Sequence, residues 1–163
     1  MRFAYADGRM PVAMTYQGSV YYFGYDQVGS LRVVIDSAGN TVKRIDYDSF
    51  GNILNDSNPS FSVPFGFAGG LHDRSTGQVR FGARDYDPAT GKWTAKDPID
   101  FGGGDLNLLG YTGQDPVNWV DPWGLGGIGL SYGGAVTERW SPEFGQWYKV
   151  EHTYKEGPCP NRR

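Results

Sequence analysis

Four aspartates in the second half of the chain stand directly before a proline, and they are the side chains best suited to do chemistry. They are Asp87, Asp97, Asp115 and Asp121. Two carboxylates that share a site can hydrolyse a peptide bond, because like charges a few ångströms apart do not both ionise, so that one acts as a base and the other as an acid. An aspartate before a proline is also a frequent turn former whose carboxylate accepts hydrogen bonds from backbone amides. Spacing alone favours the turn interpretation.

The other reactive side chains form no recognisable site pattern. His72 and His152 are the only histidines, and His72 stands beside a Ser-Thr-Gly turn, where a surface position is expected. Cys159 is the single cysteine, so it can form neither an internal disulfide nor a multi-thiolate metal site. The glycines at 102–104 lack the strand before and the helix after that a phosphate-binding loop needs. We therefore expect no cofactor and no metal.

The composition indicates a β-rich protein with many turns. Of 163 residues, 25 are glycine and 10 are proline, while 15% are aromatic. Glycine and proline interrupt helices, and the aromatic residues supply a core that a disordered tract would lack. A net charge of -3 and a pI near 5.3 give no reason to expect nucleic acid as a partner. Neither a signal peptide nor an apolar stretch of about 18 residues is visible, so no membrane span is expected.

A Tyr-Asp-x-x-Gly unit occurs twice, at residues 25–29 and 47–51. Between the two units, β-branched residues recur on both sides of Gly39-Asn40, which predicts a β-hairpin, because glycine and asparagine accept the positive φ angles of tight turns. A single hairpin is marginal in water, so such units should stack edge to edge in a longer antiparallel sheet. Earlier strands of that sheet are expected at residues 2–5 and 11–16.

The character of the sequence divides the chain into three parts. Residues 1–64 hold the hairpins and end in a turn-rich loop, residues 65–125 form a loop-rich core segment, and residues 126–163 are a variable tail. The tail opens with a glycine-rich linker and continues with alternating apolar and polar residues that predict one or two strands. Five aromatic residues are expected to pack in the fold rather than to form a sugar-binding platform. They are Tyr86, Trp93, Tyr111, Trp119 and Trp123.

The motifs of the middle part are similar to one known family. They read Gly82-Ala83-Arg84-Asp85-Tyr86-Asp87-Pro88, Gly91-Lys92-Trp93, Asp97-Pro98, Asn107-Leu108-Leu109-Gly110-Tyr111, Gln114-Asp115-Pro116 and Asp121-Pro122-Trp123-Gly124-Leu125. With these motifs and the Tyr-Asp repeats, residues 1–125 resemble the RHS repeat-associated core of bacterial polymorphic toxins and toxin-complex C subunits and, more distantly, animal teneurins. Leu109 stands where the family usually has an aromatic residue, and Gln114 where it has asparagine.

The resemblance implies a fold and a reaction. The fold is a mainly β, curled sheet of antiparallel hairpins that forms part of a hollow RHS shell. In such proteins the core cuts its own chain after the leucine of the Asp-Pro-x-Gly-Leu motif, which here is the bond between Leu125 and Gly126. The implied catalytic residues are Asp97 and Asp121, with Arg84 and Asp85 as an associated Arg-Asp step. The activity would be that of a single-turnover aspartic autoprotease, in which Arg84 either holds a carboxylate ionised or stabilises the oxyanion.

The same resemblance implies partners and a location. The partners would be the rest of an RHS shell or a toxin segment at the C-terminal end of the chain. The location would be bacterial, with the protein in the cytoplasm until a toxin-delivery system exports it as a secreted effector. A second interpretation remains open, in which the chain is a non-catalytic structural or binding module. In that case it could self-associate through its free sheet edges.

Overall fold

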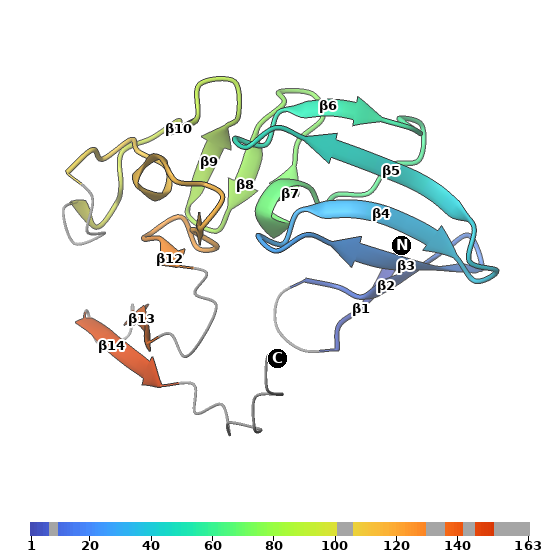
Figure 1. Cartoon of the computed structure of the whole chain (residues 1–163), viewed down its shortest axis with the longest axis horizontal. Helices are drawn as coiled ribbons and strands as arrows, with labels where there is room; N and C mark the ends of the chain where they lie inside the picture. The colour runs from blue at the N-terminus through green and yellow to red at the C-terminus, as the bar shows by residue number, and fades with distance from the viewer. Residues whose placement is uncertain (7–9, 101–105, 130–135, 142–145, 152–163) are drawn as a thin grey trace, which may run out of the picture.

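A computed structural model describes residues 1–6, 10–100, 106–129, 136–141 and 146–151, with side chains described up to residue 127. In these residues the chain is built from antiparallel β-strands and short turns, as the sequence predicts (Figure 1). No helix in the described part is long and apolar enough to cross a membrane. The glycines at 102–104 lie outside the described residues.

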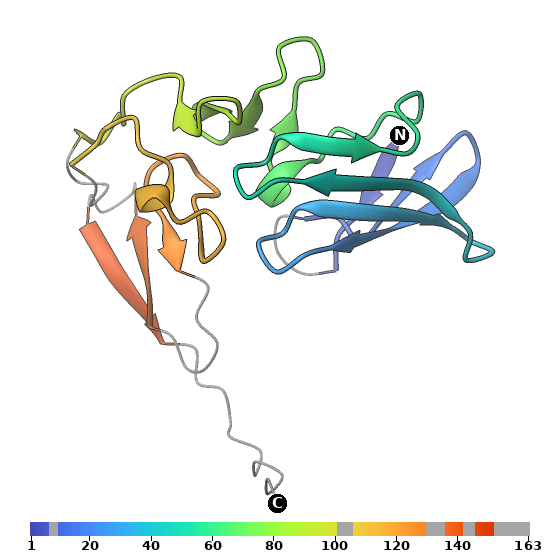
Figure 2. The ribbon, with the colours of Figure 1, turned by 45° about the horizontal axis from the view of Figure 1, so that its top comes forward.

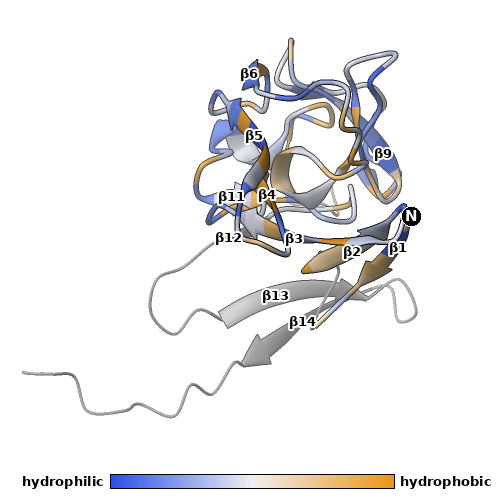
Figure 3. Cartoon of the chain, turned by 90° about the vertical axis from the view of Figure 1, so that its right-hand side faces the viewer, coloured by the Kyte–Doolittle hydropathy of each residue, from blue (hydrophilic) through white to orange (hydrophobic). Residues whose placement is uncertain are grey.

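The N-terminal half forms one six-stranded sheet. Its strands are β1 (Arg2–Ala4), β2 (Ala13–Tyr16), β3 (Ser19–Tyr25), β4 (Leu31–Asp36), β5 (Thr41–Tyr47) and β6 (Ile53–Asp56). Each strand pairs antiparallel with the next one along the chain, so the order in the sheet is the order in the sequence. Hydrophilic and hydrophobic residues follow one another closely along β5 (Figure 3), as expected of a strand with two different faces.

The aspartates of the Tyr-Asp repeats close the turns between strands. In the second repeat, Asp48 Oδ1 accepts hydrogen bonds from the N–H groups of Phe50 and Asn52, both at 2.9 Å. In the first repeat, Asp26 Oδ1 accepts from the Ser30 N–H at 2.8 Å. Carboxylates that bond to amides a few residues ahead fix the chain reversal locally. These aspartates therefore have a structural role.

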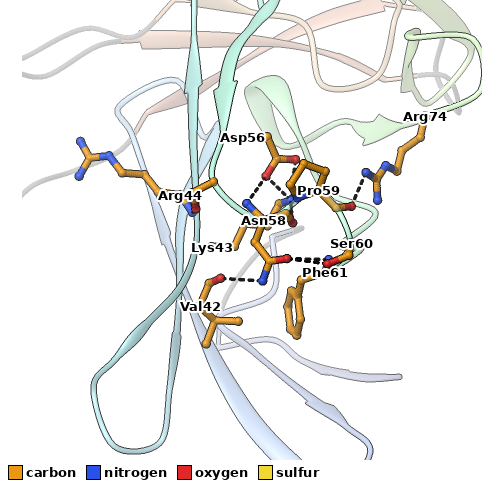
Figure 4. Close-up of polar contacts among 10 residues, drawn as sticks. Val42, Lys43, Arg44, Asp56, Asn58, Pro59, Ser60, Phe61 and Arg74 are labelled. Carbon is orange, nitrogen blue, oxygen red and sulfur yellow. Dashed lines mark hydrogen bonds and ion pairs between the residues drawn. The ribbon is translucent and has the colours of Figure 1, made fainter.

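The loop after β6 folds back over one face of the sheet and completes the first core. Val63 and Phe65 from this loop are buried with four residues from the strands. The four are Met14, Leu31, Val34 and Ile45. The loop is held by the buried ammonium of Lys43, which lies 2.6 Å from Asp56 Oδ1 and donates to the Asn58 carbonyl at 2.7 Å (Figure 4).

The second half forms a smaller sheet beside the first (Figures 1 and 2). After the short 3-10 helix η1 (Phe67–Gly69) come β7 (Leu71–His72), β8 (Val79–Phe81), β9 (Arg84–Asp87) and β10 (Lys92–Trp93). Their order in the sheet is β10-β9-β8-β7. Another short 3-10 helix, η3 (Thr112–Gln114), precedes β11 (Trp119–Val120), which pairs antiparallel with β12 (Ile128–Gly129). A final hairpin joins β13 (Val136–Ser141) and β14 (Gln146–Glu151).

Aromatic rings fill the core of the second half. The buried rings belong to Phe67, Phe81, Tyr86, Trp93 and Tyr111. The tightest pair is Tyr86 and Tyr111, with ring centroids 4.3 Å apart. Three of the five aromatic residues singled out in the sequence therefore pack inside, whereas Trp119 and Trp123 remain half exposed.

Several contacts between the two halves come from the second Tyr-Asp repeat and from Asn52, the residue that follows it. The Tyr86 hydroxyl donates to the Phe50 carbonyl at 2.8 Å, and the Asn52 side-chain amide donates to the Pro88 carbonyl at 2.9 Å. A Cβ added to Gly51 would lie 2.4 Å from the Phe67 ring, so the turn packs directly on the aromatic core. The last hairpin of the first sheet thus supports the segment that carries the candidate site.

Candidate active site

Three of the four aspartate and arginine residues implied by the sequence meet in one buried cluster. Arg84 Nη2 lies 2.8 Å from Asp97 Oδ2 and 3.2 Å from Asp121 Oδ2. Only 4% of Arg84, 8% of Asp97 and 2% of Asp121 is exposed. Two carboxylates therefore share a single guanidinium nitrogen in a site that excludes most water.

The position of Arg84 is fixed by β9 and by its neighbours. Arg84 pairs with Phe81 of β8, and its guanidinium carbon lies over the Trp93 ring, 4.2 Å from the ring centroid. Its Nε donates to the Gly124 carbonyl at 2.6 Å, and its Nη1 donates to the Leu108 carbonyl at 3.4 Å. A cation over an aromatic face is attracted by the ring electrons, and a planar fork of donors leaves little rotational freedom. These contacts together fix the position of the Arg84 guanidinium.

Asp97 is placed by the turn that follows β10. Its Oδ1 accepts a hydrogen bond from the Ile99 N–H at 3.0 Å, which leaves Oδ2 for Arg84. Its own N–H donates to the Leu108 carbonyl at 3.1 Å, the same oxygen that Arg84 approaches. Because Pro98 restrains the backbone of the residue before it, the direction of this carboxyl is set locally.

Asp121 contacts the bond that the sequence resemblance marks for cutting. Its Oδ1 accepts a hydrogen bond from the Leu125 N–H at 3.1 Å, and its Oδ2 accepts one from the Gly126 N–H at 2.9 Å. The Gly126 nitrogen is the amine side of the Leu125–Gly126 peptide bond. The carboxyl of Asp121 thus lies within hydrogen-bond distance of the atom that would leave in a hydrolysis.

Two glycines allow the loop of Asp121 to approach β9. Gly82 and Gly124 both have positive φ angles, +51° and +64°. A Cβ on Gly82 would lie 2.5 Å from the Trp123 carbonyl oxygen, and a Cβ on Gly124 would lie 2.5 Å from that of Phe81. The Ala83 N–H donates to the same Trp123 oxygen at 3.0 Å. Only glycine fits at both positions, since any side chain would push the two backbones apart.

The cluster carries more negative than positive charge. When both carboxylates are ionised, Asp97 and Asp121 together exceed the charge of Arg84 by one. Burial raises the pKa of Asp121, while the hydrogen bonds from the N–H groups of Gly126 and Leu125 and the charge of Arg84 act in the opposite direction. A carboxyl with a raised pKa holds its proton up to a higher pH, which suits a proton donor.

Asp85, the fourth implied residue, points elsewhere. Its Oδ2 is 2.6 Å from Arg80 Nη2, and its Oδ1 is paired with Arg80 Nε on a partly exposed face. Neighbouring residues on a strand face opposite sides, so Arg84 turns inward and Asp85 outward. The structure does not bring Asp85 into the cluster.

The remaining Asp-Pro aspartates close turns. Asp87 Oδ1 accepts from the Ala89 N–H at 3.0 Å. Both oxygens of Asp115 accept from the Asn118 side-chain amide at 3.0 Å. Among the described residues, no group of three or more His, Cys, Asp or Glu side chains could hold a metal ion.

Sequence reasoning missed several residues that position the site. Trp93 was expected only as packing, and the roles of the Leu108 carbonyl and of Gly82 and Gly124 were not expected. The usable signal was a glycine close to two of the three charged residues, with Gly82 before Arg84 and Gly124 after Asp121. The Leu108 carbonyl carries no signal, because every residue has a backbone oxygen.

Comparisons with known proteins support a shell architecture. A family model described as Teneurin YD-shell matches residues 1–103. Teneurin-3 of Danio rerio is 41% identical over 113 residues, which is 63% of this chain and 4% of that protein. Teneurin-m of Drosophila melanogaster is 39% identical over 128 residues, which is 72% of this chain and 4% of that protein. The chain therefore spans only a small part of the relatives that it matches.

Solved structures of similar fold are also known. The crystal structure of TcdB2-TccC3 without its hypervariable C-terminal region has a TM-score of 0.62 and 26% identity, over 68% of this chain and 5% of that one. The Photorhabdus luminescens Tc holotoxin pore with the mutation TccC3-D651A has a TM-score of 0.61 over 84% of this chain and 6% of that one. At 20% identity this second likeness shows the fold alone.

One expectation from the sequence is contradicted. We expected a bacterial protein held in the cytoplasm until export, but the curated relatives include teneurins of zebrafish, chicken and fruit fly. The reason for the error is physical. The Tyr-Asp repeats and Asp-Pro turns specify a sheet and its chain reversals, and such residues carry no information about a host or a compartment.

Proposed function

The chain belongs to the teneurin YD-shell family, and from this premise we propose that it is a shell segment that also cuts its own backbone after Leu125. The YD-shell part is common to the family match and to the structural likeness. The proposal that the chain cuts itself goes beyond the family match. It rests chiefly on one contact, the 2.9 Å hydrogen bond from the Gly126 N–H to a buried carboxylate oxygen of Asp121.

The proposed reaction is a hydrolysis by one water molecule. The water oxygen bonds to the carbonyl carbon of Leu125, the bond from that carbon to the Gly126 nitrogen breaks, and the nitrogen leaves with an added proton. In the uncut chain Asp121 Oδ2 accepts the Gly126 N–H, and the same 2.9 Å separation puts the protonated form of Asp121 close enough to give that proton once the nitrogen has lost its amide character. Burial raises the pKa of Asp121, which increases the protonated fraction.

Asp97 is the proposed base that takes a proton from the attacking water. Its Oδ2 lies 2.8 Å from Arg84 Nη2, which also contacts Asp121, so the two carboxyls are held at one site. Arg84 also holds the Gly124 carbonyl at 2.6 Å, just ahead of the bond to be cut. Because the substrate is part of the same chain, its effective concentration at the carboxylates is very high, and modest groups suffice for a single turnover.

The same contacts also favour a second, purely structural function, in which Asp121 and Arg84 act as a clamp that holds the loop after β11 against β9. Asp121 accepts two successive backbone N–H groups, from Leu125 and Gly126, which is how a carboxylate closes a loop. Arg84 would then bridge β9 and this loop without any chemistry. In this second function the chain is a structural module that pairs with the rest of a YD shell or with another copy through the outer edges of β1 and β6.

Intact mass of the purified chain under denaturing conditions separates the two functions. If the chain cuts itself, the wild type gives fragments 1–125 and 126–163, while Asp97→Asn and Asp121→Asn stay full length. Asp85→Asn is the matched control, since its carboxyl faces Arg80, and it should cut like the wild type. A folded wild type that stays full length would refute the cutting and leave the clamp.

A further inference from the structure

Two turns of the first sheet, one between β4 and β5 and one between β5 and β6, have the same local structure. In each of them the last residue is an asparagine whose N–H and side-chain amide both donate to the aspartate four residues earlier. For Asn40 the two distances to Asp36 are 2.8 and 3.0 Å, and for Asn52 the two distances to Asp48 are 2.9 and 2.8 Å. The two asparagines therefore have the same role within their own turns.

The turn between β5 and β6 also contacts the segment that carries the candidate site (Figure 1). The Asn52 side-chain amide donates to the Pro88 carbonyl at 2.9 Å, and a Cβ on Gly51 would lie 2.4 Å from the Phe67 ring. The equivalent glycine of the other turn, Gly39, has no atom within 4 Å of an added Cβ. The bond from Asn52 to Pro88 is therefore not needed to close a turn of this kind, and it serves the contact between the two halves.

Further contacts lead from this turn to Arg84. The Phe50 carbonyl accepts from the Tyr86 hydroxyl at 2.8 Å, and Tyr86 follows Arg84 by two residues on the buried face of β9. The Tyr86 ring packs 5.9 Å from the Trp93 ring, over which the guanidinium carbon of Arg84 lies at 4.2 Å. A Cβ on Gly91, between β9 and β10, would lie 3.0 Å from the Phe50 ring. The turn thus packs against the hairpin that carries Arg84.

We propose that Asn52 and Phe50 are positioning residues for the cut, which takes place only when the turn between β5 and β6 is docked on the β9–β10 hairpin. This inference rests on the proposed cutting. Asp97 and Asp121 share one arginine nitrogen, so a shift of β9 displaces the group that both carboxyls contact. A misplacement of about 1 Å in an active site can slow a reaction by about a hundredfold. The last hairpin of the first sheet thereby makes cutting depend on the folding of the repeats.

Rates of cutting in two matched double variants test the proposal. Asn52→Ala with Tyr86→Phe removes two hydrogen bonds between the halves. Asn40→Ala with Tyr25→Phe removes the same groups inside the first half, where the Tyr25 hydroxyl donates to the Pro11 carbonyl at 2.7 Å. Chains pulse-labelled during cell-free synthesis are followed over time by denaturing electrophoresis. We expect the first double variant to be cut at least about tenfold more slowly than the wild type, and the second within about twofold of it.

The outcomes separate this inference from the proposed cutting. Equal rates for the two double variants would overturn the positioning role and leave the cutting intact, whereas a wild type that is never cut overturns both. Hydrogen exchange of the strand amides shows whether each variant folds. If the first double variant does not fold, the single changes Asn52→Ala and Asn40→Ala decide the question, with an expected difference in rate of at least about threefold.

A spectroscopic signal at Arg84 distinguishes positioning from a general loss of stability. In an Asp97→Asn background, which keeps the chain full length under the proposed mechanism, the NMR resonance of the Arg84 Nε–H reports where the guanidinium lies over the Trp93 ring. Asn52→Ala should shift this resonance, and Asn40→Ala should leave it unchanged. A resonance that moves equally in both variants, or in neither, would overturn the positioning role.

Discussion

Replacing Arg84 with alanine tests whether the cluster stabilises the fold. The change removes the ion pairs to Asp97 and Asp121 and the hydrogen bond to Gly124, and it leaves two carboxylates buried without a cation. Removing one partner of a buried pair typically lowers the free energy of unfolding by about 3–5 kcal/mol. With a urea dependence of about 2 kcal/mol per molar, the midpoint of unfolding should fall by roughly 2 M.

The matched control is Arg80→Ala, four residues earlier, where the arginine pairs with Asp85 on an exposed face. Exposed ion pairs contribute little, because water and salt screen them, so the midpoint should scarcely move. Urea unfolding followed by tryptophan fluorescence measures both variants. Equal midpoints for the two variants would refute the view that the buried cluster holds the second half of the chain together.

The effect of Arg84→Ala should also depend on pH. Because burial raises the pKa of Asp121 above its ordinary value of 3.8, the folded state binds this proton more tightly than the unfolded state. The stability that Asp121 contributes is therefore fully present below pH 3.8 and is lost as the pH rises through its raised pKa in the folded state. Without Arg84 the pKa rises further, so the loss of stability in the variant should be smaller at pH 4.5 than at pH 7.5. A pH-independent difference would contradict this.

Two further substitutions test the packing around the site and the loop over the first sheet, both by urea unfolding. Gly124→Ala places a Cβ 2.5 Å from the Phe81 carbonyl oxygen and should lower the free energy of unfolding by at least about 2 kcal/mol. The control Gly77→Ala, where φ is also positive but no atom lies within 4 Å of the added Cβ, should lose about 1 kcal/mol. Equal losses would contradict the close approach. Lys43→Met leaves the Asp56 carboxylate unpaired and should lose about 3 kcal/mol. Adding Asp56→Ala should restore part of that loss, and strictly additive losses would argue against the pair.

The hairpins of the first half could be predicted because their signals are local. Gly39 has a φ of +86°, and the Asp36 carboxylate accepts hydrogen bonds from the N–H groups of Ala38 and Asn40. All of these residues lie within one turn, so sequence neighbours alone determine the geometry. The strands on either side then follow from alternation, which is why the six-stranded sheet agrees with the expectation.

The partners of the cluster could not be predicted in the same way. Arg84 and Asp85 are adjacent on β9, and only the pairing of Arg84 with Phe81 decides which of them faces the core. That register depends on tertiary packing, because shifting a strand by one residue exchanges its two faces. The family resemblance suggested Arg84 and Asp85 together, and the structure places only Arg84 at the carboxylates.

The contact between the last motif and β9 was equally beyond local reasoning. Gly82 and Gly124 are far apart along the chain, and each is glycine because the backbone of the other segment occupies the space of a side chain. From the sequence alone, both glycines could have been ordinary turn residues. A reciprocal requirement of this kind becomes visible only when the two segments are seen together.

The strand order of the first sheet has a consequence for how such proteins can change in length. Each strand from β1 to β6 pairs only with the strands before and after it in the sequence. Duplication of one hairpin would lengthen the sheet without requiring any distant pair of strands to separate and find a new partner. A gene that gains or loses a repeat therefore alters the width of the sheet while each strand pair keeps its own register, so the number of repeats can change independently of the segment that carries Arg84, Asp97 and Asp121.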